Sequence, residues 1–411
     1  MLSRRDYNIN FLVNSLDYAF FTLGLAFASV NTIFPLFARR LGAGNIEIGL
    51  IPALAYLGWS FPALWGGQIS SRLERKIPFI LKYTLFERMP FLGYTLIAFY
   101  LAANRPTLSL YLFFAMLGVS YFAMGFIGPI WMEMVGKVIH PGRTGLYFAT
   151  GSGIGALMGL WGSRMAENFL DRYPFAENFG YCFLLSCLAI AVSYVFIALN
   201  REEAEPVVPL ERGYFRSLPQ IIRSDRDFTN YLTARVFLAL GFMGGAFYTV
   251  YALERFAVPD FLVARYNAFL LVSQALSPFL WGLIGDRHGH KIVLVCGGLA
   301  ILASNMIAIF TPEPAGMYLA FALFGVNYSA LTVGGVAILL DFAPRNRRSG
   351  YLGLGSFVAW FPAFFAPLIG GKIADLFGYQ MVFWITLLLN AIGFCWLLFG
   401  VREPKTFEEF G

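Results

Sequence analysis

The sequence predicts an all-α integral membrane protein with twelve transmembrane helices in two pseudo-symmetric six-helix bundles. Of its 411 residues, 58% are hydrophobic and 13% are charged, whereas soluble proteins carry about 25% charged residues. The apolar residues fall in runs long enough for a helix to cross a bilayer, which takes about 20 residues. The two halves of the chain also share short motifs in the same order. These observations exclude a soluble enzyme, a disordered chain and a fibrous protein.

Each expected span is an apolar run bounded by glycine, proline or charged residues. A transmembrane β-barrel would instead show alternating segments of about ten residues. The spans are expected at 11–38, 46–70, 77–103, 108–135, 144–168, 179–200, 229–256, 263–285, 291–311, 315–341, 349–374 and 380–401.

The longest polar stretch divides the chain nearly in half. We therefore expect an N-terminal bundle at 1–200, a linker at 201–228 and a C-terminal bundle at 229–411. The apolar residues Ile221, Ile222 and Phe228 allow part of the linker to form an interfacial helix.

The distribution of lysine and arginine predicts the orientation. Most basic loop residues lie on the side of both termini, which places the termini and the linker in the cytoplasm of a multi-pass cell membrane protein. The other side holds Arg39, Arg40, Arg105, Arg172, Arg255 and Arg265. The net charge of +6 is spread through short loops, so nucleic acid is not an expected partner.

Three motifs of the first half recur in the second half, each at a corresponding place in the order of spans. The pairs are Pro62–Gly66 with Pro278–Gly282, Gly118–Tyr121 with Gly325–Tyr328, and Arg143–Gly145 with Arg348–Gly350. Parallel repeats of six spans place a pseudo-two-fold axis along the membrane normal and a central site between the halves. This layout predicts a carrier that works by alternating access.

The loop after the eighth span carries the most specific motif. Residues 282–291 resemble the G-x-x-x-D-R-x-G-R/K-R/K signature of the major facilitator superfamily, although His290 stands at a place that is usually basic. The first-half copy is degenerate, with Ser71 and Glu74 at the positions of the family's Asp and Gly. The resemblance implies a conformational latch, and the alternative is a plain turn anchored to lipid headgroups. The latch residues would be Gly282, Asp286, Arg287, Gly289 and Lys291.

Ionisable residues deep in a membrane span are costly to insert and are therefore functional candidates. Asp17, Glu87 and Arg88 are the candidates for proton coupling. Asp17 is favoured because the first span lines the cavity in the fold that the resemblance implies. The alternative is a structural ion pair that links the first and third spans.

Uncharged polar and aromatic residues at mid-membrane depth are candidates for binding the solute, because aromatic rings offer apolar faces with a polar tip. With 18% aromatic residues in the chain, packing or lipid contact is the competing interpretation for each. The candidates are Tyr56, Trp59, Tyr121, Tyr248, Gln274, Asn327, Tyr328 and Trp360.

The resulting hypothesis is a secondary active transporter that moves a small organic solute, coupled to protons, and works as a monomer in the lipid bilayer. The alternative is a receptor, scaffold or membrane enzyme on a carrier-like fold. We expect no enzyme activity, cofactor or metal, because no motif of that chemistry occurs and His140, His288 and His290 all lie in loops. The identity of the solute and the direction of its transport stay open.

Overall fold

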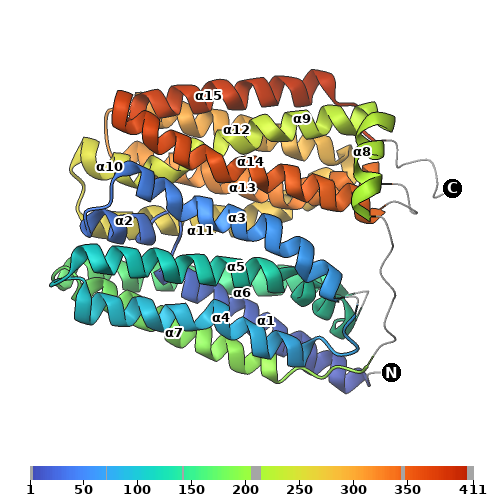
Figure 1. Ribbon diagram of the computed structural model, residues 1–411, viewed down its shortest axis with the longest axis horizontal. Coiled ribbons are helices and arrows are strands. Elements are labelled where there is room, and N and C mark those ends of the chain that lie inside the picture. The colour runs from blue at the N-terminus through green and yellow to red at the C-terminus, as the bar shows by residue number, and fades with distance from the viewer. Residues whose placement is uncertain (1–2, 71, 141–142, 205–213, 344–347, 405–411) are drawn as a thin grey trace.

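Long helices run side by side along one direction (Figure 1). The computed structural model describes residues 3–70, 72–140, 143–204, 214–343 and 348–404. The helices before residue 200 are α1 (Arg4–Phe27), α2 (Ile33–Arg40), α3 (Asn45–Ser70), α4 (Ile77–Leu96) with a π-helical end (Ile97–Leu101), α5 (Pro106–Val138), α6 (Thr144–Arg172) and α7 (Glu177–Ala198). The helices after it are α8 (Tyr214–Ser224), α9 (Arg226–Leu240), η3 (Gly241–Phe247), α10 (Tyr248–Phe256), α11 (Asp260–His288), α12 (His290–Phe310), α13 (Ala315–Phe342), α14 (Arg348–Phe377), α15 (Tyr379–Cys395) and a π-helical end (Trp396–Gly400).

The described residues confirm the expected order of twelve spans, but two spans are interrupted. The first begins at Arg4, where Ser3 and Asp6 form a capping box, and it breaks between α1 and α2. The seventh consists of α9, the 3-10 segment η3 and α10. Three glycines weaken helix formation in η3, and at Gly241 a methyl group would overlap the Asn390 side chain.

The two halves pack in the same way, which confirms the pseudo-symmetric bundles. In the first half α3 packs on α5, while α1 packs on α6 and α7; in the second half α11 packs on α13, while α9 packs on α14 and α15. The contacts between the halves obey the same symmetry, since α3 meets α14 and α11 meets α6.

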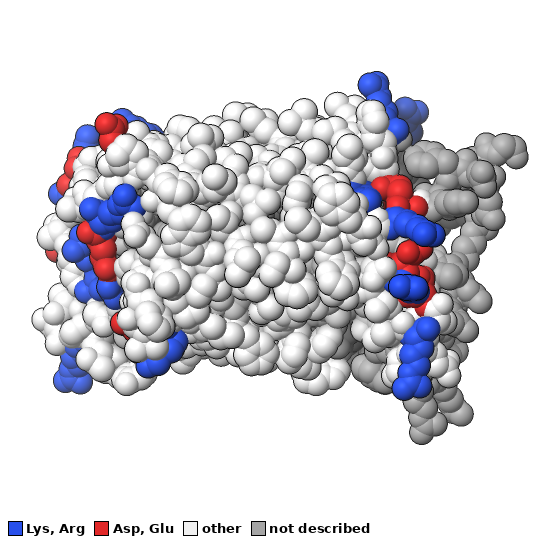
Figure 2. All heavy atoms as spheres, turned by 90° about the horizontal axis from the view of Figure 1, so that it is seen from above, with Lys and Arg blue, Asp and Glu red and all other residues white. Residues whose placement is uncertain are grey.

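The surface matches a membrane protein. Lysine, arginine, aspartate and glutamate gather at the two ends of the molecule and leave an uncharged band between them (Figure 2). Among the described residues, ten helices are long and apolar enough to cross a membrane. The remaining two expected spans are α4, which carries Lys82, Glu87 and Arg88, and the glycine-rich α6.

The two ends of the molecule are named here by what they carry. The terminal face is the end at which α1 begins and α15 leads into Val401–Pro404, and α8 runs across it (Figure 1). The opposite face is the other end, where α2 and α10 end.

Candidate functional site

A cavity of about 320 Å³ lies between the two halves. Five of the residues expected to bind the solute line it, and both halves contribute: Tyr56, Trp59, Tyr121, Gln274 and Tyr328. The described residues that line this cavity include no aspartate, glutamate, lysine or arginine. The cavity therefore offers aromatic faces, hydroxyl groups and an amide to a ligand.

Trp360 packs directly behind this lining. Its ring stacks on Tyr56 at 5.8 Å between centroids, and it meets Trp59 edge-on at 5.2 Å. Trp59 in turn meets Tyr121 edge-on at 6.2 Å. Because α3 supplies Tyr56 and Trp59 while α14 supplies Trp360, these ring contacts hold the two halves together beside the cavity.

The structure places Tyr248 and Asn327 away from the central cavity, inside the second bundle. The Tyr248 hydroxyl lies 2.9 Å from Ser304 Oγ and donates to Asn305 Oδ1 at 3.2 Å. The Asn327 amide donates to the carbonyl oxygen of Gly297 at 2.9 Å. Both polar groups therefore link helices of one bundle.

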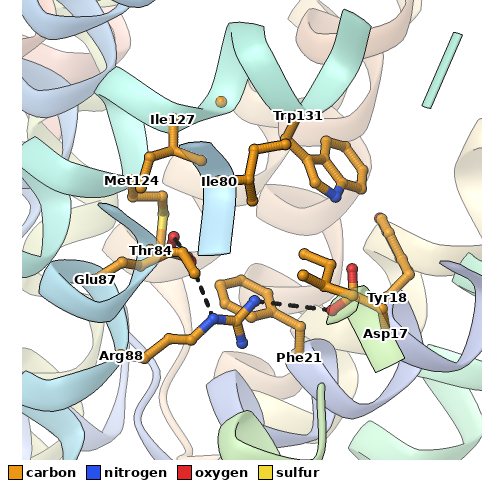
Figure 3. A pocket seen from close by; sticks show the side chains of 12 residues that line it. Asp17, Tyr18, Phe21, Ile80, Thr84, Glu87, Arg88, Met124, Ile127 and Trp131 are labelled. Atoms are coloured by element: carbon orange, nitrogen blue, oxygen red, sulfur yellow. Dashed lines mark hydrogen bonds and ion pairs between the residues drawn. The ribbon is translucent and has the colours of Figure 1, made fainter. Parts of the chain in front are cut away.

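A second pocket of about 200 Å³ lies within the first half and contains all three proton-coupling candidates (Figure 3). Arg88 Nη2 lies 3.8 Å from Asp17 Oδ1. Arg88 Nε donates to Thr84 Oγ1 at 3.0 Å, and that hydroxyl donates to Glu87 Oε2 at 3.0 Å. Thr84 thus joins the consecutive residues Glu87 and Arg88, whose side chains point about 100° apart on the helix.

Helix α7 also contributes to this second pocket, which is called the ion-pair pocket from here on. Ser193 Oγ lies 2.8 Å from Arg88 Nη1 and donates to Asp17 Oδ1 at 2.6 Å. Arg88 Nη1 also donates to the Ile190 carbonyl oxygen at 2.9 Å. The three ionisable side chains are 3–8% exposed, so one cation and two carboxyl groups are removed from water together. With both carboxyls ionised, the pocket would carry one uncompensated negative charge.

Two side chains line both the ion-pair pocket and the central cavity. They are Tyr18 from α1 and Met124 from α5. They form the wall between the two spaces, and Tyr18 directly follows Asp17 in the chain. The sequence gives no signal for this wall, because one tyrosine or methionine in an apolar span resembles any other.

Ion pairs close the gap between the halves at the opposite face. Arg39 pairs with Glu254, and Arg40 Nε donates to Asp260 Oδ2 at 2.9 Å. Arg265 Nε donates to Glu167 Oε1 at 2.8 Å. In the part of the chain that the structure describes, the ion pairs near the terminal face each stay within one half, as in Arg201 with Asp6 and His290 with Asp341.

The break between α1 and α2 also connects the halves. Its unpaired backbone carbonyls need partners, because a helix end leaves such groups without a hydrogen bond. Asn267 Nδ2 of α11 donates to the Ala26 carbonyl at 3.0 Å, and Thr249 Oγ1 of α10 donates to the Asn31 carbonyl at 2.8 Å. The sequence feature that could have predicted these contacts is the presence of the polar residues Asn267 and Thr249 inside expected spans.

The loop that resembles the family signature packs within its own half. Gly289 adopts φ +86°, and Lys291 N donates to Glu403 Oε1 at 3.2 Å. Burial raises the pKa of Glu403, while the backbone amides of Lys291 and His290 oppose that rise. The side chain of Asp286 lies outside the described residues, so the latch stays a prediction.

The same arrangement recurs in the first half and was missed from the sequence. Glu202 accepts hydrogen bonds from the backbone amides of Lys76 and Ile77, both at 2.8 Å. In each half, the glutamate that follows the last span of that half therefore accepts hydrogen bonds from backbone amides at the start of the third span of the same half. A helix N-terminus favours negative charge at this place. The sequence feature that could have predicted this contact is the Arg-Glu dipeptide that follows the last span of each half, at Arg201-Glu202 and at Arg402-Glu403.

Comparison with known proteins agrees with this architecture. The sequence model of the Major Facilitator Superfamily matches residues 261–409. The uncharacterized MFS-type transporter YuxJ of Bacillus subtilis (strain 168) is 27% identical over 139 residues, which cover 34% of this chain and 35% of YuxJ. The multidrug resistance protein MdtG of Dickeya zeae (strain Ech586) is 32% identical over 138 residues, covering 34% of this chain and 33% of MdtG. The matched segments thus span about a third of each relative's length.

Solved structures match the fold over almost the whole chain. A D-xylose-proton symporter superimposes with a TM-score of 0.73 at 13% identity, covering 97% of this chain and 99% of the symporter. The nucleoside transporter NupG gives a TM-score of 0.65 at 14% identity, covering 95% of this chain and 98% of NupG. The second half of this chain is therefore similar in sequence to the Major Facilitator Superfamily, and the whole chain shares the fold of these solved transporters.

Proposed function

We propose that this protein is a secondary active transporter that moves a small organic solute across the membrane by alternating access, coupled to protons. The observation that carries the proposal is the central cavity, which both halves line and which cross-half ion pairs seal at the opposite face. In alternating access, a central site opens first to one side and then to the other. The positive-inside rule predicts that the terminal face is cytoplasmic. Under that orientation, the ion pairs would close the cavity towards the outside.

The lining of the cavity favours a neutral or amphipathic solute with an apolar surface. Aromatic rings such as Tyr56 and Trp59 bind apolar faces, while Gln274 and the tyrosine hydroxyls offer hydrogen bonds. The names of MdtG, a multidrug resistance protein, and of the D-xylose-proton symporter support a small organic solute without specifying its polarity.

Asp17, Arg88 and Glu87 are the proposed proton site. A buried pocket with two carboxyls and one guanidinium reaches neutrality when one carboxyl holds a proton, and an uncompensated buried charge is costly. Proton uptake at Asp17 weakens its attraction to Arg88. Helix α1 carries Asp17, Tyr18 of the shared wall and the Ala26 carbonyl that Asn267 of the second half binds. One helix therefore connects the proton site, the cavity and the partner bundle.

The test begins by finding a solute. Thermal unfolding of purified protein is screened against sugars, nucleosides and amphipathic amines, because a ligand of the folded state raises the melting temperature. The best compound is then offered to proteoliposomes that contain a trapped pH indicator. Solute flux accompanied by a pH change of matching direction supports coupling, whereas flux without a pH change refutes it. Absence of any flux for compounds that bind would refute transport.

Replacing Gly49 by alanine should open the opposite face. Helices α3 and α14 touch there backbone to backbone, and a methyl group at Gly49 would overlap the Pro367 carbonyl oxygen. At Gly67, on the same helix, a methyl group would meet nothing within 4 Å. Gly49→Ala should therefore separate the two halves at the opposite face, whereas Gly67→Ala should leave the conformation unchanged.

Pulsed electron resonance between two spin labels measures this separation. The labels are placed at Asn104 and Glu313, which are exposed in opposite-face loops of the two halves, after replacement of the native cysteines. A longer distance should be populated in Gly49→Ala and not in Gly67→Ala. Identical distance distributions for the two variants would show that this contact does not control the opposite face.

A further inference from the structure

Besides the central cavity and the ion-pair pocket, a third cavity lies between the two halves, on the side of the molecule where α6 packs on α11. It measures about 290 Å³ and lies towards the opposite face. Helix α6 belongs to the first half, while α11 and α13 belong to the second, so this lateral groove spans the joint between them. Its lining is Leu160, Ser163, Arg164, Glu167, Ala264, Arg265, Ala268, Phe269 and Tyr318.

The polar end of the lateral groove carries a surplus positive charge. Glu167 Oε1 accepts from Arg265 Nε at 2.8 Å and from Arg164 Nη1 at 2.6 Å. One carboxylate thus faces two guanidinium groups. The side chain of Arg164 is 64% exposed and that of Arg265 is 45% exposed, whereas the side chain of Glu167 is 9% exposed. The cationic groups therefore form the accessible surface, and the anion lies behind them.

Each arginine stands at the head of an apolar stripe that faces outward. On α6, Trp161 and Leu157 are exposed one and two turns before Arg164. On α11, Phe269 and Leu276 are exposed one and three turns after Arg265. Because α6 runs towards the opposite face and α11 runs away from it, both stripes continue from the arginines towards the middle of the membrane.

The position of the arginines along their helices suits them to the headgroup of a lipid. At 1.5 Å per residue, Arg164 lies roughly 12 Å before the end of α6, and Arg265 lies roughly 8 Å after the start of α11. Both arginines therefore lie close to the ends of their spans, where an anionic lipid headgroup can reach them and balance the surplus charge. Guanidinium groups bind phosphate through two parallel hydrogen bonds, which suits them to this anion.

We propose that the lateral groove between α6 and α11 binds an anionic phospholipid, with its phosphate at Arg164 and Arg265 and its acyl chains along the two apolar stripes. The lipid bridges the halves beside the Arg265–Glu167 ion pair. It therefore stabilises the conformation that is closed at the opposite face, and its loss favours opening there.

The experiment measures lipid binding on purified protein and is independent of any transported solute. Thermal unfolding in detergent is recorded with added phosphatidylglycerol, phosphatidylcholine or inorganic phosphate. Wild type should be stabilised most by phosphatidylglycerol. In Arg164→Gln the affinity should fall about tenfold, as expected for one lost charge-assisted contact. Arg172→Gln is the matched control, since this exposed arginine lies two turns further along α6 and does not line the groove.

Each outcome decides the proposal. Selective stabilisation of wild type and Arg172→Gln, but not of Arg164→Gln, supports the site. Equal effects of the two phospholipids, or unchanged selectivity in Arg164→Gln, overturn it. If inorganic phosphate stabilises wild type as strongly as phosphatidylglycerol, the groove binds a free anion rather than a lipid, and the proposal fails.

Discussion

Replacing Asp17 by asparagine is expected to abolish proton-driven accumulation of the solute while leaving the protein folded. Asparagine has the shape of the protonated acid, and its amide oxygen can still accept the hydrogen bond that Ser193 now donates to Asp17 Oδ1. The pocket then holds Glu87 and Arg88 as a balanced pair. The pocket is then neutral without a bound proton, so transport of the solute is no longer coupled to transport of a proton.

The magnitude of this effect follows from the driving force. A pH difference of one unit is worth about 1.4 kcal/mol per proton, which supports roughly tenfold accumulation of a solute coupled to one proton. In proteoliposomes with such a gradient, the concentration ratio for Asp17→Asn should fall to about one, whereas exchange of labelled for unlabelled solute should persist.

The control for the Asp17 experiment is Glu177→Gln, which neutralises an exposed carboxylate in the first turn of α7, outside both pockets. It should accumulate solute as wild type does. Concentrative transport by Asp17→Asn would remove the proposed role from Asp17. Glu87→Gln then distinguishes the two carboxyls, because loss of coupling in that variant alone would move the proton site to Glu87.

The sequence predicts the order and the approximate limits of the spans because the length of an apolar run is a property of the run itself, although the first helix begins at Arg4 rather than at residue 11. The breaks between Phe27 and Ile33 and at Gly241–Phe247 are different. The first depends on Asn267 and Thr249, which supply hydrogen bonds to its carbonyls from the other half. Neither partner is adjacent in sequence, so a single-span pattern does not contain this information.

Depth in the membrane can likewise be counted along a helix, but the direction in which a side chain points cannot. Counting places Tyr248 and Asn327 at the same depth as Tyr121 and Tyr328, yet the first two face neighbours in their own bundle. The latter two line the cavity because α5 and α13 turn those positions towards the partner half. Apolar spans lack the polar stripe that reveals orientation on a soluble helix.

Removing the Arg88 charge is expected to have the largest effect on stability. Arg88→Met keeps a long unbranched side chain but deprives two buried carboxyls of their only ionic partner within the described pocket. Breaking a buried pair by removing one partner costs about 3–5 kcal/mol. The Ile190 carbonyl and Ser193 hydroxyl also lose a donor.

Acid pH should lessen this destabilisation, because protons taken up by Asp17 and Glu87 remove the uncompensated charge that Arg88→Met leaves behind. The double variant Asp17→Asn with Arg88→Met should recover part of the stability at neutral pH for the same reason. A purely steric defect would show neither dependence. Thermal unfolding in detergent between acid and alkaline pH provides the measurement.

Lys82→Met is the matched control for Arg88→Met, since Lys82 is an exposed cation on the same helix that stacks on Tyr83 at 5.4 Å. Its loss leaves no buried carboxyl without a partner, so its melting temperature should stay close to that of wild type at every pH. If Arg88→Met proved as stable as Lys82→Met at alkaline pH, the two carboxyls would have to be neutral without the arginine. The charge balance on which the proton site rests would then be wrong, even if Asp17→Asn had lost transport.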